Sequence, residues 1–268
     1  MMAPRFLLSI LHLHHSSPQL WFSGGHEFRS DGNTWRYIAI VSYITFISYF
    51  SIFAIDGKQS YIKAQEGCML ISSINFKGGQ GKSLWAAILA SWLGPKTEIL
   101  DIDPKQGDAH AWAEKAHRPS RLVWPRDLVI TLHDAASAPE WFVVDCPPHE
   151  GQESRLALEL SAMVIIPVVP AGAQDARAWG RMQDAIKDAK TLNSGLKAGA
   201  ILNGTRHTAL SRDFYELLKA WHAPREGRAV LGTVPQRVAL SEAFGAGASP
   251  RDETVTAVLA KLRRFAIL

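Results

Sequence analysis

The residues with the clearest chemical meaning lie between positions 71 and 83. An apolar run leads into a glycine-rich turn, which contains Gly78, Gly79, Gly81, Lys82 and Ser83. Glycine lets backbone N–H groups approach phosphate oxygens without a Cβ clash, and a helix after the turn adds the positive end of its dipole. Lys82 would pair with the β- and γ-phosphates, and the Ser83 hydroxyl would bind Mg²⁺. The stretch therefore predicts a phosphate-binding loop between a strand and a helix.

The loop departs from the standard phosphate-loop spacing. Phe76 stands where a glycine is usual, and Lys77 comes directly before the glycine pair. The run 77–83 resembles the deviant Walker A motif, KGGxGK[ST], of the ParA/MinD family of dimeric ATPases. The resemblance implies that the nucleotide is bound by Gly78, Gly79, Gln80, Gly81, Lys82, Ser83 and Leu84. Leu84 is itself a departure, because the family commonly has a second threonine there.

A carboxylate follows the apolar run 141–144. In a parallel α/β sheet, ligands bind beyond the carboxyl ends of the strands, so Asp145 is placed to reach a Mg²⁺-bound water as a Walker B residue. The element Asp145-Cys146-Pro147-Pro148 also resembles the ParA form of that motif. A lone aspartate after a strand is more often a turn residue. The phosphate loop on the same chain favours the metal role here.

A second acidic strand end resembles the family's switch I. The segment that resembles switch I covers residues 101–108 and includes Asp101 and Asp103. Lys105 and Asp108 depart from the usual pattern, DxDPQGN. The resemblance implies that Asp103 activates the attacking water and that Asp101 supports the Mg²⁺ shell. The two departures leave the geometry of the loop and the rate of hydrolysis open.

The resemblance also assigns a role to the extra lysine. In such proteins it reaches across a dimer interface to the nucleotide of the other subunit, so that two ATP molecules lie between the protomers. The expected catalytic residues are therefore Lys77, Lys82 and Asp103. The expected metal-binding residues are Ser83, Asp101 and Asp145.

Two later segments resemble the parts of the family that surround the base. The segment 201–206 looks like a strand ending in an asparagine, and the side-chain amide of Asn203 would read the adenine edge. The segment 231–247 looks like the family's stretch after the last strand, where a proline loop with Pro235 borders the base and a short helix follows. Both residues are expected to bind nucleotide.

The pattern of apolar residues predicts the elements that position these side chains. Strands are expected at 97–103, 128–132, 141–144, 163–169 and 198–202, besides the strand that precedes the loop. Helices are expected at 83–92, 153–161, 173–190, 210–221 and 254–267. Nearly continuous apolar strands that alternate with helices indicate an α/β fold of the P-loop NTPase type, a mostly parallel sheet with helices on both faces. We expect one ATPase domain over residues 69–268.

Residues 1–68 do not resemble the rest of the chain. They contain an uncharged run, 37–55, that is long enough to span a bilayer, although it also carries several hydroxyl side chains. Met69 lies where relatives usually begin, and residues 65–67 can be encoded by a purine-rich ribosome-binding sequence. We interpret 1–68 as translated upstream sequence or a poorly structured or helical N-terminal extension, with a membrane anchor at 37–55 as the alternative.

Composition sets broad limits. The chain has 47% hydrophobic and 20% charged residues, as folded proteins do, and a formal charge of +4 that is compatible with an anionic partner. It has two cysteines and no metal-binding cysteine pair, which fits a cytoplasmic protein. Basic residues scattered over the C-terminal part could contact DNA phosphates, and the candidates are Arg237, Lys261, Arg263 and Arg264.

The leading functional prediction is a ParA-type ATPase of the cytoplasm and nucleoid. It would use ATP and Mg²⁺, form a homodimer on ATP binding, bind DNA without sequence preference and drive plasmid or chromosome partition with a ParB-like centromere-binding protein. The alternatives are a MinD-like positioning ATPase that associates with the membrane through 37–55 or the last helix, and a nucleotide-switched adaptor with little hydrolysis. The amphipathic pattern of the last helix favours packing on the sheet over membrane binding.

Overall fold

The computed structural model describes residues 69–268 except Ala171, His207 and Leu268. The expectations for 1–68, including the membrane anchor at 37–55, lie outside the described residues. In the part of the chain that is described, no helix is both long and apolar enough to cross a membrane.

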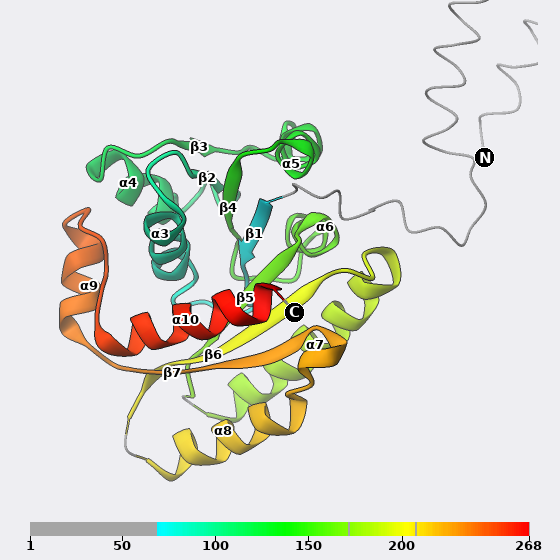
Figure 1. Ribbon diagram of the computed structural model, residues 1–268, viewed down its shortest axis with the longest axis vertical. Helices are drawn as coiled ribbons and strands as arrows, with labels where there is room; N and C mark the ends of the chain where they lie inside the picture. Colours follow the sequence, from blue (N-terminus) through cyan, green and yellow to red (C-terminus); the bar gives the residue numbers. More distant parts are fainter. Residues whose placement is uncertain (1–68, 171, 207, 268) are drawn as a thin grey trace, which may run out of the picture. The chain divides into compact units, whose positions relative to one another are not determined.

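The described strands form one parallel sheet with the order β3-β2-β4-β1-β5-β6-β7 (Figure 1). The strands are β1 (Met69–Ser73), β2 (Glu98–Asp101), β3 (Ser120–Leu122), β4 (Trp141–Asp145), β5 (Met163–Val168), β6 (Lys197–Thr205) and β7 (Arg228–Pro235). The strand that leads into the glycine-rich loop, β1, lies between β4 and β5. The predicted α/β fold of the P-loop NTPase type is confirmed.

Helices cover both faces of the sheet. They are α3 (Lys82–Leu93), α4 (Asp108–Lys115), α5 (Leu128–Ser137), α6 (Gln152–Leu160), α7 (Ala173–Leu192), α8 (Ala209–Trp221), α9 (Val238–Gly245) and α10 (Glu253–Ile267), with a 3₁₀ turn η1 (Pro224–Glu226). The buried side chains of α3, α4, α9 and α10 belong to one hydrophobic cluster, and those of α5 to α8 belong to the other. Two separate cores therefore sandwich the sheet, as its continuous apolar strands require.

Two sequence predictions were wrong. Residues 128–132 were expected to form a strand but begin the helix α5, in which Leu128 and Leu132 are buried while Val129 and Ile130 are exposed. This spacing of four residues is helical, whereas the strand of this region is the short β3. The segment from 231 was expected to follow the last strand, but 231–235 is the end of β7 itself.

The strand register brings the polar residues at the carboxyl ends together. Ser73 at the end of β1 is paired with Asp145 at the end of β4, which is paired in turn with Asp101 at the end of β2. Because all the strands are parallel, the loops that follow them meet at one edge of the sheet. The glycine-rich loop, the acidic strand ends and the segments after β5, β6 and β7 therefore share this edge.

Candidate nucleotide-binding site

The glycine-rich loop connects β1 to α3 in a conformation that requires glycine. Gly79 and Gly81 have φ angles of 72° and 88°, in the left-handed region. A Cβ on Gly81 would lie 2.5 Å from the Nδ2 atom of Asn203. The loop therefore passes close to the end of β6, and a larger residue at position 81 would displace it.

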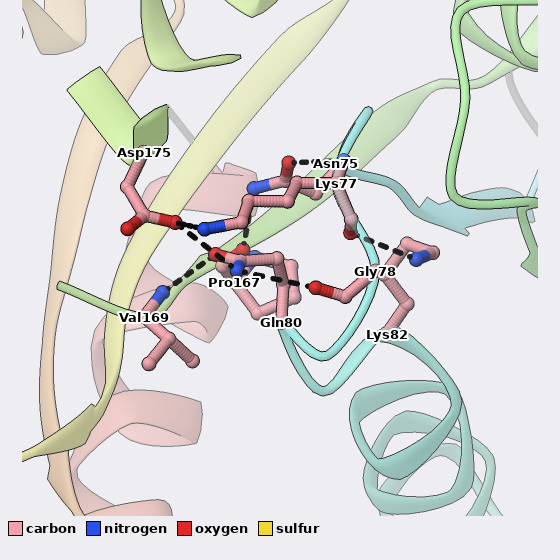
Figure 2. Close-up of polar contacts among 8 residues, drawn as sticks. All are labelled: Asn75, Lys77, Gly78, Gln80, Lys82, Pro167, Val169 and Asp175. Atoms are coloured by element: carbon pink, nitrogen blue, oxygen red, sulfur yellow. Dashed lines mark hydrogen bonds and ion pairs between the residues drawn. The ribbon is translucent and has the colours of Figure 1, made fainter. Parts of the chain in front are cut away.

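Three carboxamide side chains fasten the loop to neighbouring strands. Asn75 Nδ2 donates to the Pro167 carbonyl at 2.8 Å, and the Oε1 atom of Gln80 accepts the Val169 N–H at 2.7 Å (Figure 2). Asn203 Nδ2 donates to the Gln80 carbonyl at 3.0 Å. All three side chains are buried. The shape of the loop is thus fixed by hydrogen bonds within the chain.

Lys82 lies at the start of α3, where its ammonium group is buried beside the loop. Its Nζ atom donates to the Lys77 carbonyl at 3.3 Å. Burial lowers the pKa of Lys82, and the nearby Asp145, Cys146 and Asp103 act in the opposite direction. A buried cation in a glycine-rich loop at the start of a helix suits an anionic ligand, because phosphate oxygens would replace the water that Lys82 has lost.

Asp145 has the environment expected of a residue that binds a cation. Its Oδ1 atom is buried without a hydrogen-bond partner among the described residues. Burial raises the pKa of Asp145 well above its usual range, and the negative charge of Asp101 adds a smaller effect in the same direction. A hydrogen bond with Ser83 and the positive charge of Lys82 act in the opposite direction. Mg²⁺ bound by Asp145 and Ser83 would offset both the burial and the repulsion. The residues present therefore fit the metal.

The described residues hold no cluster of three acidic, histidine or cysteine side chains that could bind a metal unaided. Mg²⁺ usually takes one or two protein oxygens and completes its shell with water and phosphate. When bound, the ion would neutralise charge on the transferred phosphoryl group.

Asp101 is fully buried and fixes the acidic loop. Its Oδ1 atom accepts the Asp103 N–H and its Oδ2 atom accepts the His110 N–H, each at 3.1 Å. Burial raises the pKa of Asp101, and these backbone hydrogen bonds lower it. Both carboxylate oxygens hold the ends of the segment that contains Asp103, so this geometry favours a positioning role. Its predicted role in the metal shell stays a prediction.

The side chain of Lys77 forms an ion pair with Asp175, a residue that the sequence did not point to. Its Nζ atom is 2.5 Å from Oδ1 of Asp175, in the first turn of α7 (Figure 2). The Lys77 side chain is 30% exposed, whereas that of Asp175 is 1% exposed. The lysine thus combines a buried anchor with access to the surface.

The predicted base-binding residues lie on adjacent strands. Asn203 and Pro235 are at the carboxyl ends of β6 and β7, where Asn203 is paired with Val234 and Thr205 with Pro235. One donor of the Asn203 amide is used by the loop, and its oxygen remains an acceptor for an amino group. Their contact with adenine stays a prediction.

The candidate DNA-binding residues do not form one group. Arg237 follows β7 at the edge that carries the loop, and its Nε atom is 3.2 Å from Oδ2 of Asp252. Lys261, Arg263 and Arg264 are exposed near the end of α10. That end lies at the opposite edge, because Lys197, the first residue of β6, donates to the Ala266 carbonyl.

The fold and this site together define a P-loop nucleotide-binding protein. A family model described as the CobQ/CobB/MinD/ParA nucleotide binding domain matches residues 71–250, and the chain belongs to that family. It is therefore a ParA/MinD-family ATPase, as the motif in the loop predicted.

The chain is 27% identical over 161 residues to the maintenance of carboxysome distribution protein A of Halothiobacillus neapolitanus, which covers 56% of this chain and 73% of that protein.

Solved structures of low sequence identity share the fold. A plasmid partition protein of Borrelia burgdorferi B31 bound to AMPPNP superposes with a TM-score of 0.58 at 18% identity, over 74% of this chain and 99% of the other. The ATP complex of a Cyanothece McdA variant gives a TM-score of 0.56 at 14% identity, over 74% and 97% of the two chains.

Proposed function

We propose that the chain is a partition ATPase that binds Mg·ATP, dimerises around it, binds DNA without sequence preference and is stimulated by a ParB-like partner. The observation that carries this proposal is the position of Lys77. This lysine belongs to the phosphate loop, and its side chain is partly exposed and is held by Asp175. Such a lysine can exchange Asp175 for a phosphate of a facing subunit.

The cargo is proposed by likeness alone. One structural neighbour is described as a plasmid partition protein, and one sequence relative is named for the distribution of carboxysomes. Both descriptions concern the placement of a large object in the cell, and we assign plasmid or chromosome DNA as the cargo of this chain.

The last helix gives no support to membrane association. Its apolar side chains, Val255, Val258, Leu262 and Phe265, are buried in the core. An amphipathic helix that binds a membrane must instead expose its apolar face. We therefore assign α10 to the covering of the sheet.

Two lysine substitutions test the proposal. Lys82→Ala should abolish binding of fluorescent ATP, because it removes the buried cation of the loop. Lys77→Ala should bind ATP but remain monomeric in light scattering with Mg·ATP. The reason is that Lys77 is proposed to contact the nucleotide bound by the facing subunit and not the nucleotide in its own loop. Lys96→Ala, an exposed lysine in the turn before β2, is the control and should behave as the unmodified protein.

ATPase assays with and without DNA and the product of a neighbouring gene complete the test. Stimulated hydrolysis is expected. The absence of hydrolysis under every condition would exclude a partition ATPase, and ATP-dependent dimers of the Lys77→Ala variant would exclude the dimer model.

A further inference from the structure

The side chain of Gln80 joins the phosphate loop to the segment after β5. Its Oε1 atom accepts the Val169 N–H, and its Nε2 atom donates at 3.4 Å to Oδ1 of Asp175, the oxygen that also accepts Lys77 (Figure 2). We propose that Gln80 is a positioning residue that sets the place of the Lys77 ammonium through Asp175 and couples the loop to the start of α7. The inference rests on the proposed function for the role of Lys77.

The orientation of the Gln80 amide follows from its two neighbours. A backbone N–H can only donate, so the Gln80 oxygen must face Val169 and the NH₂ group must face Asp175. The Gln80 carbonyl is held by Asn203. With backbone and side chain both fixed and the residue buried, Gln80 is a rigid link between β5, β6 and α7.

Asp175 is the point at which the two loop residues meet. It is a nearly completely buried carboxylate, and burying such a group is costly unless donors surround it. Lys77 and Gln80 are two of its donors. When Lys77 moves toward another anion, the hydrogen bond from Gln80 stays with the carboxylate and reduces the cost of the move. Gln80 therefore affects both where Lys77 rests and how readily it leaves.

A substitution that keeps the size of the side chain tests the link. Gln80→Met removes both polar ends while filling a similar volume. We expect faster hydrogen exchange in peptides covering 168–176 and about tenfold weaker binding of mant-ATP, because two hydrogen bonds that order the loop are lost. Gln174→Met is the matched control, since Gln174 precedes Asp175 on α7 but is exposed, and it should change neither quantity.

A double variant that swaps the carboxamide and the carboxylate between positions 80 and 175 gives a second test. A general loss of stability would not produce the result expected from it. Gln80→Glu keeps the acceptor for Val169 but places a carboxylate against Asp175, and Asp175→Asn removes the carboxylate that holds Lys77. Each single variant weakens the contact between Gln80 and Asp175 that orders the loop, so each should bind mant-ATP about tenfold more weakly. In the double variant, the carboxylate introduced at position 80 faces the amide NH₂ group introduced at position 175, so most of the affinity should be recovered. Additive losses in the double variant would overturn the proposal.

The hydrogen-exchange measurement on the Gln80→Met variant needs no nucleotide. This separates the inference from the proposed function. An unmodified protein that fails to bind mant-ATP would refute the nucleotide function, whereas the effect of Gln80→Met on the 168–176 peptides would still be measurable. Exchange in those peptides equal to that of the Gln174→Met control would refute the positioning role of Gln80, whatever the protein binds.

Discussion

At the scale of single residues, Asp145 combines a functional demand with a cost to stability. Its carboxylate is buried next to a second buried carboxylate, that of Asp101, and both pKa values are raised by burial. A metal ion or phosphate-bound cation relieves this arrangement, but the protein without ligand does not benefit from it. We therefore expect a bound cation to stabilise the acidic strand ends.

The isosteric change Asp145→Asn should separate these effects. We expect the part of ATP affinity that depends on Mg²⁺ to fall at least about tenfold, in the range found when groups around a metal are altered. The melting temperature of the ligand-free variant should equal or exceed that of the unmodified protein, because the repulsion between the buried carboxylates of Asp145 and Asp101 is removed. Titration calorimetry with and without EDTA and a thermal melt measure the two quantities.

Asp184→Asn, an exposed position on α7, is the matched control. Mg²⁺-dependent binding that survives in the Asp145→Asn variant would show that the ion is held elsewhere.

Residue types and spacing predicted which side chains of the loop and strand ends lie near one another. The loop lysines, Ser83 and Asp145 lie together as the motif implied, since a glycine-rich turn after a strand leaves few alternative geometries. Asp175 could not be predicted, because it is 98 positions from Lys77 and looks like an ordinary helix residue. Gln80 was assigned to the nucleotide as part of a motif, and its side-chain hydrogen bonds depend on where β5 ends. The pairing of Asp175 with Lys77 and the side-chain hydrogen bonds of Gln80 depend on tertiary structure that no local pattern encodes.

At the scale of elements, the errors in the sequence analysis also have a physical cause. A short, mostly apolar run fits either a buried strand or the inner face of a helix, and the β-branched residues of 128–132 favoured the strand. The three residues of β3 were too few to give a pattern. The long helices and the central strands, by contrast, repeat their periodicity over enough residues to be recognised.

The last helix offers a prediction at this scale. Asp252 precedes α10, where its Oδ1 atom accepts the Val255 N–H at 2.8 Å and the Thr254 hydroxyl at 2.6 Å. Burial alone would raise the pKa of Asp252, but these hydrogen bonds and the charge of Arg237 lower it below its ordinary value of 3.8. Asp252→Ala should lower the free energy of unfolding by about 1 kcal/mol, as the loss of a helix cap does.

The pH dependence of that loss follows from the direction of the pKa shift. A carboxyl group whose pKa is lower in the folded state stabilises the protein above its unfolded pKa and loses this contribution as the pH falls through its folded pKa. The difference between Asp252→Ala and the unmodified protein should therefore be constant from about pH 8 to about pH 5 and shrink in more acidic solution. Urea unfolding at several pH values measures it.

Glu253→Gln removes a charge from the same turn without removing the cap, and it should cost only a few tenths of a kcal/mol. An equal loss in both variants would mean that charge near the helix end, and not the hydrogen bonds of Asp252, stabilises α10.

At the scale of the whole sheet, the candidate DNA-binding residues lie at its two opposite edges. Substitutions at each edge can therefore show which of them contacts DNA. Arg237 is partly neutralised by Asp252, whereas Lys261, Arg263 and Arg264 have no ion pair among the described residues. We expect the α10 residues to supply most of the contacts with DNA phosphates. Changing all three to glutamine should reduce the slope of log K against log salt by up to about 2.7, at about 0.9 for each lost contact.

Fluorescence anisotropy with a random-sequence duplex and ATP-bound protein gives these slopes. Arg237→Gln should reduce the slope by no more than about 0.9. Lys187→Gln, on the exposed side of α7, is the control and should leave it unchanged. A larger effect of Arg237 than of the α10 residues would place the DNA at the edge that carries the nucleotide loop.

The order of the strands also has a consequence for synthesis of the protein. The phosphate loop follows the first described strand, but its support comes from β4 and β5 on either side and from Asn203, 123 positions after Gln80. A nascent chain that has exposed the loop therefore lacks the partners that shape it, and parallel pairings of this kind form slowly. We therefore expect nucleotide binding to begin only after the chain through Asn203 has been made.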